Sequence, residues 1–158
     1  DSGKLGKIAE VKIWTNRPVW PQGFAFPQPD PSKKPNDLNW DLWLGPSAEI
    51  PYTPNLHPFN WRGWWDYGTG ALGDVGCHLV DIPFRTLGLH YPLDAECSVG
   101  TVFTKMWTPD YNPEGCPASS FITINFAATP KSKSPIQMTW SDGGIRPSRP
   151  SIIPADMD

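Results

Sequence analysis

Three polar residues in the stretch YGTGALGDVGCHLVD (residues 67–81) have the types and the spacing for acid–base chemistry. Asp74, His78 and Asp81 follow one another at intervals of four and three residues, which places them in one narrow sector of a helix. A carboxylate one turn before a histidine can accept a hydrogen bond from the imidazole and stabilise its charged form. This arrangement suits a histidine that takes a proton from a substrate hydroxyl. A solvated helix face, or an ion pair that anchors the helix, would give the same spacing.

The same three residues make a weaker candidate for a metal site. No CxxC or HExxH spacing accompanies them, and a structural zinc ion takes four ligands. His57 and His90 stand alone in the sequence, where a structural or surface role is the default. We therefore expect no metal site in this chain.

The stretch GTGALG, in the same segment, matches the G-x-G-x-x-G pattern of dinucleotide-binding loops. That pattern works only where a buried strand leads into the glycines, and the preceding NWRGWWDY is not rich in valine or isoleucine. Asp94 lies at about the distance of a ribose-binding acid, but it precedes the next expected strand instead of ending it. We interpret Gly68 and Gly70 as a turn into a helix, with Thr69 as its N-cap.

The apolar pattern predicts one helix, from about Gly70 to Leu87, that carries the polar stripe. Gly73 and Gly76 within it indicate close approach by another backbone or a ligand, because glycine costs about 1 kcal/mol relative to alanine inside a helix. Segments of alternating apolar and polar residues predict strands within residues 7–18, 95–107, 119–128 and 134–144. One apolar side and one Thr/Ser-rich side suit an antiparallel sheet covered on one face. These elements predict an α+β fold with an open, mostly antiparallel sheet and the helix packed on one face.

Residues 15–66 form a long connection that holds ten prolines and six tryptophans without sustained periodicity. A structureless connection of this length is rare in a compact domain and is usually functional. We expect its tryptophans to pin it against the rest of the protein, and NWDLWLG (residues 39–45) to form a short helical turn that Pro46 stops. The alternative is that at least one of Trp20, Trp61, Trp64 and Trp65 faces a ligand, although packing is favoured for any single one of them.

Length and composition exclude several classes of protein. The 158 residues fit one domain, and a net charge of −3 with scattered lysines and arginines predicts no binding to nucleic acid or to an anionic membrane surface. No apolar run approaches the roughly 18 residues that a membrane-spanning helix needs. Three scattered cysteines form no disulfide framework, and their odd number favours a reduced protein while leaving cytoplasm and bacterial periplasm both open.

With these residues assembled, the sequence resembles the Gfo/Idh/MocA family of NAD(P)-dependent oxidoreductases, specifically the domain that follows the Rossmann half. The stretches that carry the resemblance reach from Leu5 to Pro150, and they are LGKIAEVKIWTNRPVWPQG, LNWDLWLGPS, HPFNWRGWWDYGTGALGDVGCHLVD and MTWSDGGIRPSRP. The third is the most specific, because it joins a glycine-rich G-D-x-G-x-H-x-x-D pattern to a tryptophan-rich approach.

The resemblance implies a two-domain parent, in which an N-terminal Rossmann domain binds NAD or NADP and supplies a lysine. The C-terminal domain of such a parent closes the substrate pocket and often mediates oligomers, so a homo-oligomer through the sheet is expected. His78 would be the acid/base on a substrate hydroxyl, and Asp74 would orient it or touch the substrate. The further substrate-binding candidates are Arg62, Asn16, Arg17, Trp65 and Asp81.

The chain departs from the family pattern in three ways. It has no Glu-Lys-Pro motif, no G-x-G-x-x-G within a βαβ unit, and none of the strands and helix that the family places after W-S-D-G-G. We therefore expect residues 1–158 to be a single substrate-binding domain without its Rossmann domain, unable to bind NAD(P) or to turn over by itself. The expected parent acts on a sugar, polyol or glycoside. The alternatives are an NAD-dependent glycosidase of the same family, and a non-catalytic carbohydrate-binding or oligomerisation module.

Overall fold

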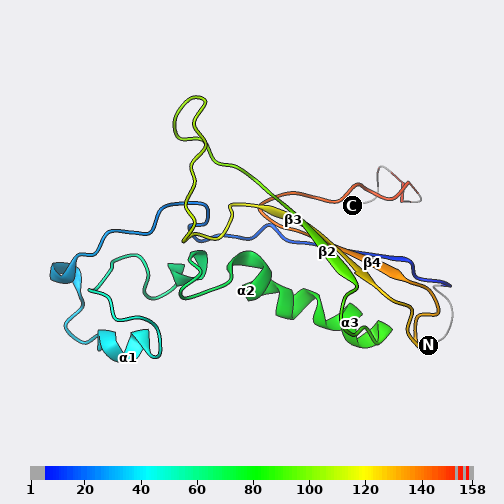
Figure 1. Cartoon of the computed structure of the whole chain (residues 1–158), viewed down its shortest axis with the longest axis horizontal. Coiled ribbons are helices and arrows are strands. Elements are labelled where there is room, and N and C mark those ends of the chain that lie inside the picture. Colours follow the sequence, from blue (N-terminus) through cyan, green and yellow to red (C-terminus); the bar gives the residue numbers. More distant parts are fainter. Residues whose placement is uncertain (1–5, 152, 155, 157–158) are drawn as a thin grey trace.

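The computed structural model of the chain describes residues 6–151, 153–154 and 156. The molecule is elongated, with a sheet and two helices at one end and an irregular region around a short helix at the other (Figure 1). Its elements in chain order are β1 (Glu10–Trp14), η1 (Pro31–Lys33), α1 (Trp40–Leu44), η2 (Asn60–Gly63), α2 (Gly70–Leu79), α3 (Asp81–Leu87), β2 (Asp94–Val99), β3 (Ser120–Phe126) and β4 (Ile136–Ser141). No helix in these residues has the length and apolar character needed to cross a membrane.

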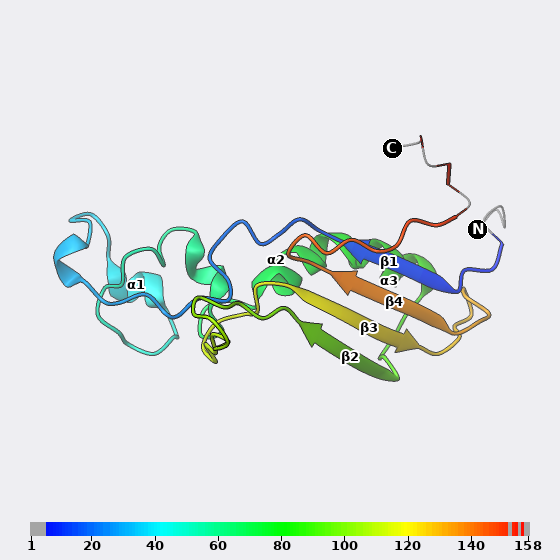
Figure 2. The same ribbon diagram turned by 90° about the horizontal axis from the view of Figure 1, so that it is seen from above.

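The four strands form one mixed sheet in the order β1-β4-β3-β2 (Figure 2). Strand β3 runs antiparallel to both β4 and β2, whereas β1 runs parallel to β4 with Glu10 opposite Gln137. The prediction of an α+β fold with a mostly antiparallel sheet is therefore confirmed, since two of the three adjacent pairs are antiparallel.

One face of the sheet carries the main hydrophobic core, and α2 and α3 lie against that face (Figure 1). The three residues that were predicted to share the apolar face of β4, Ile136, Met138 and Trp140, are each 1% exposed and belong to this core. Burying a side chain such as Ile136 or Met138 stabilises the fold by about 1.5–3 kcal/mol relative to leaving it in water. The buried members of this cluster are Ile13, Leu87, Leu89, Phe126, Ile136, Met138 and Trp140.

The single helix predicted from Gly70 to Leu87 is wrong, because the chain forms two helices with Val80 between them. Pro83 has no amide hydrogen, so the carbonyl of Leu79 receives no intrahelical hydrogen bond from it. The chain keeps helical dihedral angles at Val80 (φ −79°, ψ −30°), which lets α3 follow α2 directly.

The second predicted strand is also shorter than expected. Strand β2 ends at Val99, and residues 100–116 leave the sheet as a loop that projects on the side opposite the helices (Figure 1). Gly100 marks this exit, because a Cβ atom there would lie 2.1 Å from the hydroxyl of Ser119.

Residues 19–68, which we call the aromatic lobe, build a second hydrophobic cluster out of an almost irregular chain. The predicted helical turn is present as α1, where Asn39 accepts a capping hydrogen bond from the amide of Leu42 (3.0 Å) and Gly45 ends the helix with a φ of 58°. Four tryptophans of the lobe pack in this cluster, since Trp43 and Trp61 lie against its buried members. Its buried members are Trp40, Leu44, Tyr52, Leu56 and Trp64.

Candidate functional site

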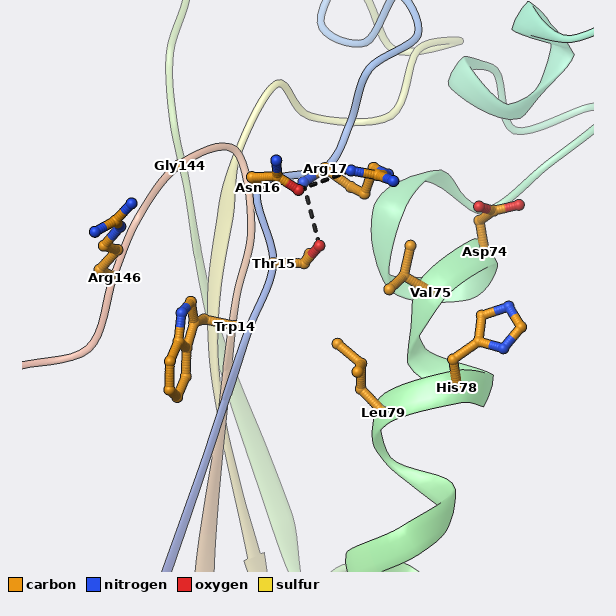
Figure 3. Close-up of a pocket in the computed structure, with 10 residues that line it drawn as sticks. All are labelled: Trp14, Thr15, Asn16, Arg17, Asp74, Val75, His78, Leu79, Gly144 and Arg146. Atoms are coloured by element: carbon orange, nitrogen blue, oxygen red, sulfur yellow. Dashed lines mark hydrogen bonds between the residues drawn. The ribbon is translucent and has the colours of Figure 1, made fainter. Parts of the chain in front are cut away.

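A cavity of about 710 Å³ opens where the end of β1, the turn after β4 and one side of α2 meet (Figure 3). Residues 14–17 form one wall, four residues of α2 form another, and Gly144 and Arg146 complete the lining. The residues of α2 that line it are Asp74, Val75, His78 and Leu79.

The wall after β1 is tied to the chain after β4. Thr15 donates its amide to the carbonyl of Ser141 (3.0 Å), and Gly143 donates its amide to the carbonyl of Arg17 (2.6 Å). Gly143 must be glycine, since its φ is 66° and a Cβ atom would lie 2.3 Å from that of Ser119. These contacts place the polar residues 15–17 beside the turn that carries Arg146.

A buried carboxylate fixes that turn. Asp142 is 2% exposed and accepts hydrogen bonds from the amide and hydroxyl of Ser120 and from the indole of Trp140 (2.9 Å). Its charge is compensated by three donors, as a buried carboxylate requires. Asp142 is therefore a structural residue of the W-S-D-G-G stretch, positioned behind the cavity wall.

Helix α2 places Asp74 and His78 on one side, as their spacing predicts. Figure 3 shows both side chains turned away from the strands, whereas Val75 and Leu79 face them. The His78 imidazole is exposed, and the hydrogen bonds of the described residues include none between it and Asp74. The expected hydrogen bond between them is thus not formed in this structure, and their catalytic roles stay predictions.

The partner of Asp74 is Arg62 instead. The Arg62 Nε atom donates to the Asp74 Oδ1 atom at 2.7 Å, and both side chains are about one-quarter to one-third exposed. The guanidinium lies 4.4 Å from the ring centre of Trp61 and 4.6 Å from that of Phe59, distances typical of cation–π contacts. The Arg62 guanidinium is charged and is positioned by these rings, so it is a strong hydrogen-bond donor to the Asp74 carboxylate.

The remaining predicted residues divide into two groups. Asn16 and Arg17 line the cavity, and the Arg17 Nη1 atom donates to the Asn16 Oδ1 atom at 2.8 Å (Figure 3). Trp65 is 50% exposed, and Asp81 is exposed with an ion pair to Arg85 at 3.7 Å. Arg62, Trp65 and Asp81 do not contribute to the lining of this cavity.

Neighbouring protein atoms occupy the space beside the glycines of the glycine-rich stretch. A Cβ atom at Gly68 would lie 2.8 Å from the Cα atom of Arg62, and one at Gly70 would lie 2.9 Å from the Cβ atom of Cys116. Gly70 also has a φ of 63°, and Thr69 makes no side-chain capping hydrogen bond. These glycines accommodate the neighbouring chain and do not fit a pyrophosphate-binding loop.

The close approach predicted at Gly73 comes from the Thr69 side chain one turn earlier, since a Cβ atom at Gly73 would lie 1.6 Å from the Thr69 hydroxyl oxygen, and not from another backbone. A Cβ atom at Gly76 would meet only the side chain of Leu72, one turn earlier in the same helix.

Residues 19–96 match the family model GFO_IDH_MocA_C2, described as oxidoreductase family, C-terminal alpha/beta domain. Residues 19–96 therefore belong to a C-terminal domain of the Gfo/Idh/MocA oxidoreductase family. The match covers the aromatic lobe, α2 and α3, so the irregular lobe is part of the Gfo/Idh/MocA domain. No curated protein matches the chain.

Two residues that line the cavity, Trp14 and Arg146, were not predicted from the sequence. Trp14 is 52% exposed at the end of β1, on the polar side of the strand. A large aromatic residue on that side was the feature of the sequence that could have indicated a role in binding. Arg146 follows the W-S-D-G-G stretch, and it reaches the cavity because β4 pairs with β1. The local sequence around Arg146 does not predict that pairing.

Within the described part of the Gfo/Idh/MocA domain, no group of three or more His, Cys, Asp or Glu side chains is arranged to hold a metal ion. Of the cysteines, Cys116 is buried, and its burial raises the pKa of the thiol to about 11. Cys116 therefore stays protonated near neutral pH and is not a nucleophile there.

Proposed function

We propose that this chain is the substrate-facing domain of an NAD(P)-dependent oxidoreductase that acts on a sugar, polyol or glycoside. The observation that carries the proposal is a cavity lined both by His78 of α2 and by the polar Asn16 and Arg17, beside a domain of an oxidoreductase family. A concave site with a few convergent polar groups and one aromatic wall suits a polyhydroxylated ligand.

In this proposal His78 accepts a proton from the substrate hydroxyl that is oxidised. Its exposed imidazole is free to meet a ligand. The Asp74 Oδ1 atom is held by Arg62, and no hydrogen bond of the described residues engages the Oδ2 atom. That second oxygen is available to accept from a substrate hydroxyl or from the imidazolium once it forms.

The cofactor is proposed to be held by a Rossmann domain of the parent, because the glycines of this chain are filled by protein contacts. NAD(P), where bound, supplies the hydride acceptor. The openness of His78 supports a site that a second domain covers, since enclosing a site excludes water and strengthens its electrostatic interactions.

The test has two parts. Titration of NADH fluorescence with the 158-residue chain should show no saturable binding, and tight stoichiometric binding would refute the assignment of the cofactor to another domain. In the parent enzyme, His78→Ala should lower kcat by about 10²–10⁴-fold, the usual contribution of a general base. His90→Ala is the matched control, because His90 is exposed and does not line the cavity. Equal rates for the two variants would contradict the role of His78.

Product analysis separates the two reactions open to such a parent. A ketosugar formed with net NADH indicates a dehydrogenase, whereas cleavage of a glycoside without net NADH indicates the NAD-dependent glycosidase.

A non-catalytic carbohydrate-binding or assembly module is a second candidate, favoured by the pairing of Asp74 with Arg62 instead of His78. It predicts that His78→Ala leaves the activity of the parent intact while removal of aromatic cavity groups weakens sugar binding.

We also propose that the domain forms a homo-oligomer through the sheet face that α2 and α3 leave uncovered. On that face Trp14 and Phe121 flank Ser141 in one cross-strand row, and they are 52% and 37% exposed. Phe121→Glu should shift the mass measured by light scattering towards the monomer, whereas Ile82→Glu, at an exposed site on α3, should not. A monomeric wild-type chain at micromolar concentration would contradict this assembly.

A further inference from the structure

We propose that Arg17 forms an oxyanion subsite in this cavity, so that the preferred substrate carries a carboxylate or phosphate group. The proposal rests on the assignment of the cavity as a substrate site, and it names the class of substrate more narrowly. A sugar acid or a sugar phosphate meets this requirement, and a neutral polyol does not.

The charges around the cavity carry the first step. Its charged lining groups are Arg17, Arg146 and Asp74, together with the titratable His78. Asp74 is already paired with Arg62 at 2.7 Å, which balances its charge. The ion pairs of the described residues include none to Arg17 or Arg146. A chain with a net charge of −3 thus leaves two uncompensated guanidinium groups at one cavity, and such a cavity attracts anions.

The fixed position of Arg17 carries the second step. Its amide donates to the Thr15 hydroxyl at 3.2 Å, and its carbonyl accepts from the amide of Gly143 at 2.6 Å. The Nη1 atom donates to the Asn16 Oδ1 atom at 2.8 Å. The Nε and Nη2 atoms donate to no group of the described residues. A guanidinium that is held at one nitrogen and keeps other donors free is suited to bind a carboxylate or phosphate.

The direction of the two arginines distinguishes their roles. Figure 3 shows the Arg17 side chain extending towards α2, on the side of Asp74, whereas Arg146 lies on the other side of the β1 chain. Arg17 is half-buried, so its charge is screened less by solvent than that of a fully exposed arginine. Arg17 is therefore the group that contacts the anion, and Arg146 contributes only to the positive potential.

The experiment compares ligands that differ in charge. The 158-residue chain is titrated at low ionic strength with gluconate, glucose 6-phosphate and glucitol, and amide chemical shifts are followed by NMR. Gluconate or glucose 6-phosphate should bind with a Kd about tenfold lower than glucitol, the effect expected of a charge-assisted hydrogen bond. Equal dissociation constants for the charged and neutral ligands would overturn the proposal.

Variants assign the preference to one residue. Arg17→Gln should abolish the charge preference. Arg17→Lys should retain part of it, because the positive charge remains without the planar guanidinium. Arg85→Gln removes the same charge from an exposed site on α3 and should behave as wild type. If Arg17→Gln does not fold, Arg17→Lys tests the proposal. A preference for charged ligands equal to that of the wild type in this variant would overturn the role of the guanidinium in the oxyanion subsite.

NADP⁺ and ADP-ribose form a third arm, because a dinucleotide also carries phosphate oxyanions. Arg17-dependent binding of these nucleotides without any binding of gluconate or glucose 6-phosphate would overturn the assignment to the substrate. The readout is separate from the test of His78, because binding needs no turnover. A charge preference that persists in His78→Ala supports the subsite even where His78 proves dispensable.

Discussion

The sheet with its two helices and the aromatic lobe are both held by hydrophobic clusters, yet they are built in different ways. In the sheet, strand ladders satisfy the backbone, and side chains such as Ile136 and Met138 enter the core at every second position. In the lobe, local turns and side chains satisfy the backbone, as where the Trp40 indole donates to the carbonyl of Ile50 at 2.8 Å. Regular strand pairing therefore holds the sheet region together, and packing of aromatic side chains holds the lobe together.

The candidate site belongs to the sheet region and is joined to the lobe by one ion pair. The segment after β1 presents Arg17 and α2 carries Asp74, whereas Arg62 of the lobe pairs with Asp74 without lining the cavity. The position of Asp74 in the site therefore depends on both regions.

The largest effect is expected in the sheet. Trp140→Ala should lower the free energy of unfolding by about 3–5 kcal/mol, because it leaves a cavity in the core and removes a donor from the buried Asp142. Urea denaturation followed by circular dichroism measures the change. A loss below about 1 kcal/mol would show that the sheet core is not the main source of stability.

The matching substitution in the lobe should act locally. Trp40→Ala removes an indole that stacks on Trp43 at 4.6 Å, and we expect a loss of about 3 kcal/mol confined to residues 19–68. Amide hydrogen exchange should show loss of protection in α1 and retained protection in β3 and β4. Leu42→Ala, at a 79% exposed position of the same helix, is the control. Equal loss of protection in both regions would show that they unfold as one unit.

The contact between the two regions should respond to alkaline pH. The pKa of the Cys116 thiol is raised from 9.0 to about 11, and the amide of this residue donates to Gly63 of η2. The thiol ionises near pH 9 in the unfolded chain but stays protonated in the folded one. Stability should therefore fall as the pH rises from 9 to 11, by up to about 2–3 kcal/mol. Cys116→Ala should show a smaller decrease over this range, and identical pH profiles would contradict the prediction.

The ion pair that joins the lobe to α2 should have a smaller effect. Arg62→Gln replaces a 2.7 Å charged hydrogen bond in a part-buried setting, and we expect a loss of about 1–2 kcal/mol in thermal unfolding. Arg85→Gln breaks an exposed pair at 3.7 Å and should change stability by less than about 0.5 kcal/mol. If the two variants lose equal stability, the Arg62–Asp74 pair does not couple the regions.

The smallest effect is expected at Trp64, where the lobe contains a buried hydrogen-bond donor that the described residues leave unsatisfied. The Trp64 indole N–H is buried, and it has no hydrogen-bond partner among the described residues. Trp64→Phe should change stability by less than about 1 kcal/mol, because removal of an unsatisfied donor offsets the lost ring volume. Trp40→Phe, which leaves the Ile50 carbonyl without its partner, should cost more in the same denaturation experiment.

The elements with a clear period were predicted from the sequence, and the pairings between them were not. Alternation in residues 119–128 and 134–144 located β3 and β4, and the polar stripe located α2. The parallel pairing of β1 with β4 was not predicted, because the alternation within a strand does not indicate which strand it pairs with. The break before Asp81 was missed although Pro83 was visible, since the apolar pattern continues through it.

The site was predicted in part for the same reason. Spacing placed Asp74 and His78 together, and the fold brings Asn16 and Arg17 to the same cavity. The pairing of Asp74 with Arg62 was not predicted, because these residues are twelve positions apart and meet through the η2 turn instead of along one helix.

The register of β1 has a consequence for how the protein is made. Glu10 lies opposite Gln137, so β1 finds its hydrogen-bonded neighbour only after the residues between these two strands have been synthesised. Until then Val11 and Ile13 have no core to enter, and closing so long a loop is slow. During that interval the apolar side of β1 is exposed and is available to chaperones that hold unfolded chains.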